Sequence, residues 1–402
     1  LIAQRNGKRS RKLVKKSILG LTSMTHRGAI GADGKTGDGC GLLFDLNHSF
    51  FKLKVVGELD VELPDFFAVA QLFHKNDIDF YYSSIRKFLN SQDLDIAVTR
   101  SVPVNNEVLG KIARQNLPNI SQVFITSKNT NLNKERFEAC LLQARKFIEE
   151  KFDNDEEFYV CSMSTQTIVY KGLMLPSAID EFYLDLKDKK FEAKICLFHQ
   201  RFSTNTLPRW HLAQPFRLLA HNGEINAIRG NRNWAKARKS KFSTALIPEI
   251  TTFKNLVNEK GSDSSALDNM IEILVKGGIN TFRALRMVLP PAWQNIHMMD
   301  AEIKSFHEYN SMHMEAWDGP AGIVMSDGRW AICLLDRNGL RPARYQIDSE
   351  GYVTIASEIG VFPQDESNFI TKGRIGAGGI FAIDTETGEL IDQSIIDNKL
   401  KE

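Results

Sequence analysis

Three polar segments near the middle of the sequence carry side chains that could bind a small ligand and do chemistry on it. Histidine, arginine, asparagine and hydroxyl residues occur together there, close to apolar runs that are typical of strands. Loops built in this way usually hold a ligand. An Asn-Gly pair alone is weak evidence, because it is also the commonest hairpin signal. The three segments are HQRFSTNT (199–206), LLAHNGEIN (218–226) and RGNRNW (229–234).

A cysteine and a histidine could form a nucleophile and a base in this region. Cys196 or Cys40 could supply the thiolate, and His199 or His221 the base. Cys196, however, lies inside an apolar run that is typical of a strand, where a thiol is inert. We therefore expect a core thiol rather than a catalytic one.

The sequence GKT (34–36) suggests a phosphate-binding loop, but the pattern fails at a defining position. The glycine required five residues before Gly34 is Ala29. We therefore interpret the glycines between positions 28 and 41 as a loop that allows close backbone approach and leads into a strand at 42–44.

Composition and charge indicate a globular protein without affinity for nucleic acid or membranes. Of the 402 residues 43% are hydrophobic, and the formal net charge is only +2, so no overall field draws the chain onto polyanions. No uncharged apolar run reaches the roughly 18 to 20 residues that span a bilayer. The basic start (5–16) resembles a signal peptide only superficially, because its apolar part is too short. Five scattered cysteines without a Cys-x-x-Cys pair argue against disulfides and metal sites and favour a reducing, cytoplasmic location.

Apolar periodicity and turn signals predict a mixed fold. Helices are expected at 12–24, 80–89, 136–152 and 266–275, and strands at 67–73, 165–170, 195–199, 322–325, 330–335 and 352–356. Ser262 and Asp263 are candidate caps for the last helix. The turns at 326–328 and 348–351 predict antiparallel hairpins. Without a regular β-α-β alternation, this pattern indicates an α+β layered sandwich, with residues of about 76–190 as a possible insertion on the same body.

Together with five further motifs, the polar segments resemble the class II glutamine amidotransferases. The further motifs are MTHRGA (24–29), GDG (37–39), KGSDS (260–264), WDGP (317–320) and DRNGLRP (336–342). NRNW (231–234), WDGP and IVYKG (168–172) resemble the glutamate synthase branch of that class, and the matches run from residue 3 to residue 381. The resemblance implies an N-terminal-nucleophile hydrolase fold, an αββα four-layer sandwich. It also implies that 1–402 is one type 2 amidotransferase domain.

The resemblance further implies which residues bind glutamine. Free glutamine carries a carboxylate and an ammonium on its α-carbon, so a selective site needs one fixed cation and one fixed anion. Arg201 and Asp263 match these positions, and a guanidinium offers two parallel donors to a carboxylate. Thr204 matches a residue near that carboxylate. The alternative interpretation of Arg201 is a structural ion pair.

Catalytic roles follow from the same resemblance. The Asn222 side-chain amide and the Gly223 backbone N–H match the donors to the oxyanion, and Arg27 matches the arginine beside the nucleophile. In the family the nucleophile is an N-terminal cysteine in a Cys-Gly-x-Gly-Phe stretch, whose own α-amino group carries the proton. The start LIA (1–3) matches only the end of that stretch, and the first residue is not methionine. We therefore expect a truncated chain that hydrolyses no glutamine as written.

These observations predict the glutaminase domain of a glutamate synthase, as a fragment of a larger multidomain enzyme. The domain would release ammonia from L-glutamine for transfer to 2-oxoglutarate in a synthase domain beyond Glu402. The resemblance implies FMN, an iron-sulfur cluster and NAD(P)H or ferredoxin for the full enzyme, with a small electron-donating subunit as a further partner, but no cofactor and no metal in this chain. Two alternatives stay open. One is another class II amidotransferase, which the long segment between Phe44 and Arg201 disfavours, and the other is a catalytically inactive glutamine-binding domain.

Overall fold

The largest sheet contains seven antiparallel strands in the order β14-β12-β13-β1-β8-β2-β7. The computed structural model describes residues 1–402 except 130–131, 202–207, 297, 363–365 and 402. The strands of this sheet are β1 (Ile2–Gln4), β2 (Cys40–Asp45), β7 (Thr167–Gly172), β8 (Ile195–Gln200), β12 (Arg344–Asp348), β13 (Tyr352–Ala356) and β14 (Phe369–Arg374).

A second antiparallel sheet of five strands packs face to face on the first. Its order is β16-β15-β11-β10-β9, so β9 is an outermost strand. One apolar layer joins the two sheets, with Leu43 and Leu197 from the first sheet against Cys333 and Ile383 from the second. The strands of this sheet are β9 (Leu219–Gly223), β10 (Ala321–Ser326), β11 (Trp330–Leu335), β15 (Ile380–Asp384) and β16 (Leu390–Ile391).

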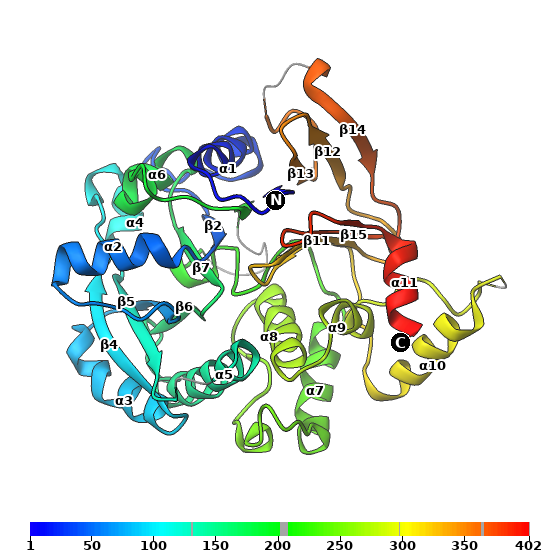
Figure 1. Ribbon diagram of the computed structural model, residues 1–402, viewed down its shortest axis with the longest axis horizontal. Coiled ribbons are helices and arrows are strands. Elements are labelled where there is room, and N and C mark those ends of the chain that lie inside the picture. The colour runs from blue at the N-terminus through cyan, green and yellow to red at the C-terminus, as the bar shows by residue number, and fades with distance from the viewer. Residues whose placement is uncertain (130–131, 202–207, 297, 363–365, 402) are drawn as a thin grey trace.

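Helices cover much of the outer face of each sheet, whereas β12 and β14 extend beyond them (Figure 1). The seven-stranded sheet shares its outer apolar cluster with α1 (Arg11–Ser23), α2 (His48–Leu59) and α6 (Ile179–Phe182). The five-stranded sheet shares its own with α7 (Ile228–Arg238), α8 (Asp263–Lys276), α9 (Thr281–Val288), α10 (Ala301–His313) and α11 (Gln393–Lys401). In the part of the chain that the structure describes, no helix is long and apolar enough to cross a membrane. The layers therefore follow the order αββα, and the predicted α+β sandwich is confirmed.

A smaller third sheet in the order β4-β5-β3-β6 extends from one side of this sandwich. Its strands are β3 (Ala68–His74), β4 (Leu94–Ser101), β5 (Asn119–Ser127) and β6 (Tyr159–Ser164). The helices α3 (Ile78–Asn90) and α5 (Lys134–Lys151) pack on one face of it, and α4 (Lys111–Gln115) lies between β4 and β5 in the chain. The strands and helices of this unit span 68–164. The insertion expected from the sequence was 76–190, but β7, which lies within that range, belongs to the seven-stranded sheet.

The helices and strands predicted from the sequence are present, with ends displaced by a few residues. Both predicted hairpins pair in the antiparallel sense, as β10 with β11 and β12 with β13. Ser262 caps α8, because its side chain accepts the Ser265 backbone N–H at 3.1 Å. Local turn and cap chemistry was therefore a reliable guide to these elements.

A buried ionic group ties the four-stranded sheet to the main body. Arg100 on β4 is 2% exposed and donates to both carboxylate oxygens of Asp185 at 2.8 Å. The same guanidinium donates to Glu58 of α2 at 2.6 Å and to Gln122 of β5 at 2.9 Å. Because Asp185 is itself 1% exposed, its charge depends on this single arginine for neutralisation.

We expect Arg100→Ala to lower the free energy of unfolding by about 3–5 kcal/mol, because it leaves the Asp185 carboxylate buried without its counterion. Urea unfolding followed by circular dichroism measures the change. Arg86→Ala is the control, since Arg86 pairs with Asp95 on the surface, where an ion pair contributes little. Equal effects of the two substitutions would contradict this assignment.

Candidate functional site

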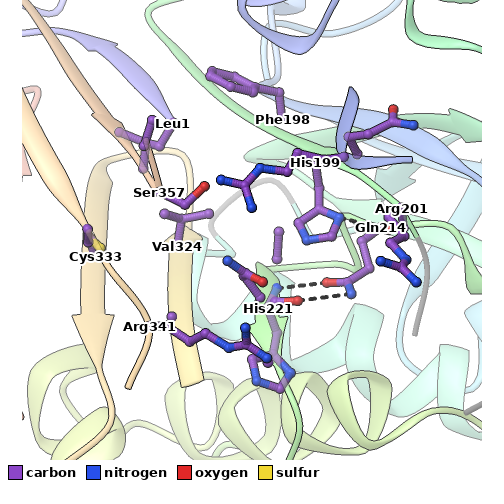
Figure 2. A pocket seen from close by; sticks show the side chains of 18 of the residues that line it. Leu1, Phe198, His199, Arg201, Gln214, His221, Val324, Cys333, Arg341 and Ser357 are labelled. Carbon is purple, nitrogen blue, oxygen red and sulfur yellow. Dashed lines mark hydrogen bonds between the residues drawn. The ribbon is translucent and has the colours of Figure 1, made fainter. Parts of the chain in front are cut away.

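A cavity of about 280 Å³ lies where β8 of the large sheet approaches the outer strand β9. Its walls come from the ends of β8 and β9, from the 24–27 turn, from β10 and from the chain on either side of β12 and β13. Figure 2 shows side chains from these separate segments converging on one space. The volume suits a ligand the size of one amino acid.

Four of the six site residues predicted from the sequence line this cavity, namely Arg27, Arg201, Asn222 and Gly223. Asp263 begins α8, and the neighbouring Ser264 lines the cavity. Thr204 lies outside the described residues. The structure thus brings together at one cavity segments that lie far apart in the sequence.

Strand pairing places the two candidate oxyanion residues. Asn222 pairs with Gly322 and Gly223 pairs with Ala321 on β10. Gly223 has a φ of 152°, and a Cβ at this position would collide with the Pro320 carbonyl oxygen. Glycine therefore allows the close approach to Pro320, whose carbonyl accepts the Glu224 backbone N–H at 2.9 Å.

The start of β9 is held by a buried carboxylate. Asp268 on α8 accepts backbone N–H groups from Arg217 at 3.3 Å, Leu218 at 2.8 Å and Leu219 at 3.2 Å. Burial, together with the nearby Glu272, raises the pKa of Asp268 to about 6. These bonds fix β9 relative to the helix whose first turn carries Asp263.

The outer edge of β9 is completed by a side chain instead of a strand. The Gln214 amide accepts the His221 backbone N–H at 2.7 Å and donates to the His221 carbonyl at 3.2 Å, as the dashed lines in Figure 2 show. This pair of bonds reproduces what a neighbouring strand would offer. It keeps Asn222, the next residue, in the register that faces the cavity.

Neighbouring groups hold the Asp263 side chain at the N-terminus of α8. Its Oδ2 accepts the Ile225 backbone N–H at 2.8 Å and lies 3.8 Å from His221 Nδ1, while Oδ1 accepts the Ser264 hydroxyl at 3.3 Å. Burial lowers the pKa of His221, whose Nδ1 also contacts the Ser264 hydroxyl at 2.8 Å. These contacts fix the carboxylate beside Ser264, which lines the cavity.

The two candidate arginines have acidic neighbours. Arg27 donates from Nε to Glu358 at 2.8 Å, and His26 Nε2 lies 2.9 Å from the same carboxylate. Burial opposes ionisation of Glu358, but the bonds from Arg27 and His26 outweigh it and lower its pKa. Arg201 Nε lies 3.7 Å from Asp38 Oδ2. Both arginines line the cavity, and about half of each side chain is exposed.

The five cysteines are buried and unpaired. Burial raises the pKa of Cys161, Cys196 and Cys333 to about 12, and it also raises those of Cys40 and Cys140. Of these residues only Cys333 reaches the cavity wall. A thiol in such a setting is not a nucleophile, so the internal cysteine-histidine pair considered from the sequence is disfavoured.

Leu1 lies in the cavity wall at the start of the described chain. Its backbone nitrogen donates to the Ile355 carbonyl and its carbonyl accepts the Ile355 N–H, each at 2.9 Å. Leu1 therefore extends the pairing of β1 with β13 to the cavity, and its backbone nitrogen is located there.

Several cavity residues were not identified from the sequence as site residues. Gln214, Glu224 and Arg341 all line the cavity, although Arg341 lies within the DRNGLRP motif. The position of Arg341 in a motif with a turn sequence could have identified it as a site residue. Gln214 lies in no motif that would have marked it. Within the described residues no group of three or more histidine, cysteine, aspartate or glutamate side chains could hold a metal ion.

The family model for "Glutamine amidotransferases class-II" matches residues 1–402. Over 97% of its length the chain is 37% identical to the Saccharomyces cerevisiae protein named Glutamate synthase (NADH), and it covers 19% of that protein. It is 38% identical to Glutamate synthase (NADPH) large chain of Azospirillum brasilense, covering 97% of this chain and 26% of that one. With the Bacillus subtilis protein of the same name the identity is 37%, over 100% of this chain and 27% of the relative. The chain spans about a fifth to a quarter of the length of these curated relatives.

Among solved structures, the chain is similar to a glutamine phosphoribosylpyrophosphate amidotransferase from B. subtilis, described as complexed with ADP and GMP. The TM-score is 0.34 and the sequence identity 14%, over 81% of this chain and 48% of that one. A glutamine aminotransferase class-II domain protein from Silicibacter pomeroyi gives a TM-score of 0.32 at 13% identity, over 56% of this chain and 84% of that one. Both likenesses are distant.

We expect none of the five thiols of the native chain to react with a disulfide reagent within minutes at pH 8, because each is buried and scarcely ionised. After unfolding in guanidinium chloride all five should react, which provides the control. Absorbance of the released chromophore counts the thiols in both states. A rapidly reacting thiol that L-glutamine protects would instead indicate an internal nucleophile.

Proposed function

The chain belongs to the class II glutamine amidotransferases, and we propose that its cavity hydrolyses the side-chain amide of L-glutamine to give L-glutamate and ammonia. The observation that carries this proposal is the convergence of Arg201 from the end of β8 and Asn222-Gly223 from β9 on one cavity of about 280 Å³. A cation and a pair of amide donors around one cavity match the carboxylate and the reacting amide of a single amino acid.

Substrate binding is assigned to three side chains. Arg201 pairs with the α-carboxylate, because a guanidinium offers two parallel donors. Asp263 accepts the α-ammonium, and its position beside the cavity wall, fixed by Ile225 and Ser264, supports this role. Thr204, which lies outside the described residues, is assigned to the carboxylate by the family pattern alone.

Asn222 and Gly223 are assigned to the oxyanion. When a thiolate attacks the amide carbon, the carbonyl oxygen becomes negative, and donors that are already in place stabilise it. Losing one such donor typically costs about 3–4 kcal/mol of transition-state stabilisation. Arg27, on the same cavity wall, is assigned to the nucleophile, where its positive charge favours a thiolate.

We place the nucleophile on a cysteine that precedes Leu1 in the family pattern. Two observations support this assignment: Leu1 lies in the cavity wall, and the five cysteines of the chain are buried with raised pKa values. The α-amino group of a terminal cysteine, with a usual pKa near 8, would take the thiol proton and pass it to the leaving ammonia. One residue then supplies nucleophile, base and acid.

In a larger polypeptide the released ammonia would pass to 2-oxoglutarate in a synthase domain that follows Glu402. The support is that the relatives named glutamate synthase are about four to five times longer than this chain. FMN, an iron-sulfur cluster and the NAD(P)H or ferredoxin donor, with its small subunit, are assigned to parts outside this chain. Five unpaired cysteines are typical of a reducing compartment such as the cytoplasm.

We expect the chain that starts at Leu1 to release no glutamate from L-glutamine, and a chain carrying Cys-Gly-x-Gly ahead of Leu1 to release it, because only the second has an ionisable thiol at the cavity. A coupled glutamate assay measures both.

The matched control carries serine in place of the added cysteine and should be inactive while folding normally. Turnover by the chain that starts at Leu1 would contradict the assignment of the nucleophile. Glutamine binding without turnover in the cysteine-bearing chain would favour the inactive glutamine-binding domain.

In the cysteine-bearing chain, Asn222→Ala should lower kcat by about 10²–10³ with little change in KM, whereas Arg201→Lys should mainly raise KM. The amide oxygen becomes anionic only in the transition state, while the carboxylate carries the same charge throughout. Steady-state kinetics of both variants measure the split. Equal losses of kcat would mean that a binding residue has been taken for a catalytic one.

A further inference from the structure

Arg201 has a backbone conformation that is unusual for its residue type. Its φ is 88°, and the only other described non-glycine residues with positive φ are Asp60 and Asp93, at 54° and 57°. Aspartate tolerates the left-handed region because its short polar side chain can bond locally, but arginine has no such compensation. The conformation therefore costs free energy and persists only because the surroundings hold it.

Contacts on both sides of the peptide hold Arg201 in place. Its N–H donates to the Gly39 carbonyl at 2.7 Å, and its carbonyl accepts Nδ1–H of His199 at 2.8 Å. Gly39 lies just before β2 and His199 near the end of β8, two strands that pair with each other. The left-handed turn is thus fixed at its N–H by one strand and at its carbonyl by the other.

We propose that His199 is a positioning residue, whose Nδ1–H holds the Arg201 carbonyl and so fixes the turn that sets Arg201 at the cavity wall. The inference rests on the proposed function, in which Arg201 binds the substrate carboxylate. It adds to that binding site a residue that acts through Arg201 and not on the reacting atoms.

The chemistry of the imidazole supports this role. A carbonyl oxygen only accepts, so Nδ1 must carry the hydrogen. Burial lowers the pKa of His199 to about 4, so the ring is neutral near pH 7 with its single hydrogen on Nδ1. Protonation at lower pH would leave that N–H in place, so the contact is available across the neutral range. A ring committed in this way is not available as a base through Nδ1.

The position of Arg201 also depends on Asp38, the residue before Gly39. Asp38 Oδ2 lies 3.7 Å from Arg201 Nε, and burial raises the pKa of Asp38. The GDG motif (37–39) therefore contacts Arg201 twice, once through a backbone carbonyl and once through a carboxylate. His199 supplies the third contact, from the opposite side of the turn.

The test is calorimetric binding of L-glutamine to the chain Leu1–Glu402, which requires no nucleophile. His199→Ala should weaken binding about tenfold, the equivalent of about 1.4 kcal/mol at 25 °C. His199→Asn should recover binding to within about threefold of the original, because its side-chain N–H can occupy the position of Nδ1–H. In the cysteine-bearing chain the same substitutions should raise KM and leave kcat nearly unchanged.

His48 provides the matched control. Its ring nitrogen also bonds a backbone carbonyl, that of Phe67 at 3.0 Å, and burial also lowers its pKa. It lies on α2 and is not part of the cavity wall. His48→Ala should therefore leave glutamine binding unchanged, although it removes the same kind of bond.

Each outcome decides the proposal. Weaker binding by His199→Ala, recovery by His199→Asn and no effect of His48→Ala support it. Unchanged binding by His199→Ala, in a chain that otherwise binds glutamine, overturns it and leaves the proposed function intact. Equal losses of glutamine affinity in His199→Ala and His48→Ala also overturn it, because both would then reflect general destabilisation of the protein. If the unaltered chain binds no glutamine, the proposed function fails first and this inference fails with it.

Discussion

The buried carboxylate of Asp268 fixes the start of β9, and the candidate site depends on that strand. Asp268 accepts three consecutive backbone N–H groups at 2.8–3.3 Å, and Gln214 occupies the outer edge of the strand at His221. An edge strand without such contacts could shift its register, and a slip of one residue exchanges the two faces of a strand. Together with the pairing of β9 and β10, these two polar side chains hold the register that brings Asn222 and Gly223 to the cavity.

A buried carboxylate needs compensation, and the structure supplies it from a distant part of the chain. Arg217 lies 4.0 Å from Asp268, and it also donates to Glu149 of α5 and to the Val160 carbonyl at 3.0 Å. Arg145 of α5 pairs in turn with Glu149 at 2.7 Å and with Glu272. Removing one member of such a group leaves a buried charge without its partner. The four-stranded unit is therefore more than an appendage, since its long helix carries counterions on which β9 depends.

How much of this could be predicted from the sequence depends on the range of the interactions. Turns and caps are local, so the hairpins and the Ser262 cap of α8 were predictable. Helix α2 was not predictable, because Phe50 and Phe51 are both buried between neighbouring layers and leave no clear apolar stripe. The residue types of the site followed from its motifs. The left-handed turn at Arg201 could not be predicted, since it depends on the pairing of β2 with β8. The contact of the Gln214 side chain with the edge of β9 has no sequence signal either.

The charges around the cavity fit a substrate that is neutral overall but becomes anionic during reaction. Arg27 is paired with Glu358, and Arg201 lies near Asp38, whereas for Arg341 no ion pair is found within the described residues. Burial lowers the pKa of His221, and Arg341 lowers it further, so that ring adds no charge near pH 7. The arginines of the cavity wall favour a thiolate and an oxyanion over their neutral forms. The same positive groups oppose an ammonium group, so an amino acid can bind here only if a carboxylate faces its ammonium. Glu224 lies in the cavity wall, and Asp263 is fixed at the start of α8 by the Ile225 backbone N–H; the proposed function gives this task to Asp263.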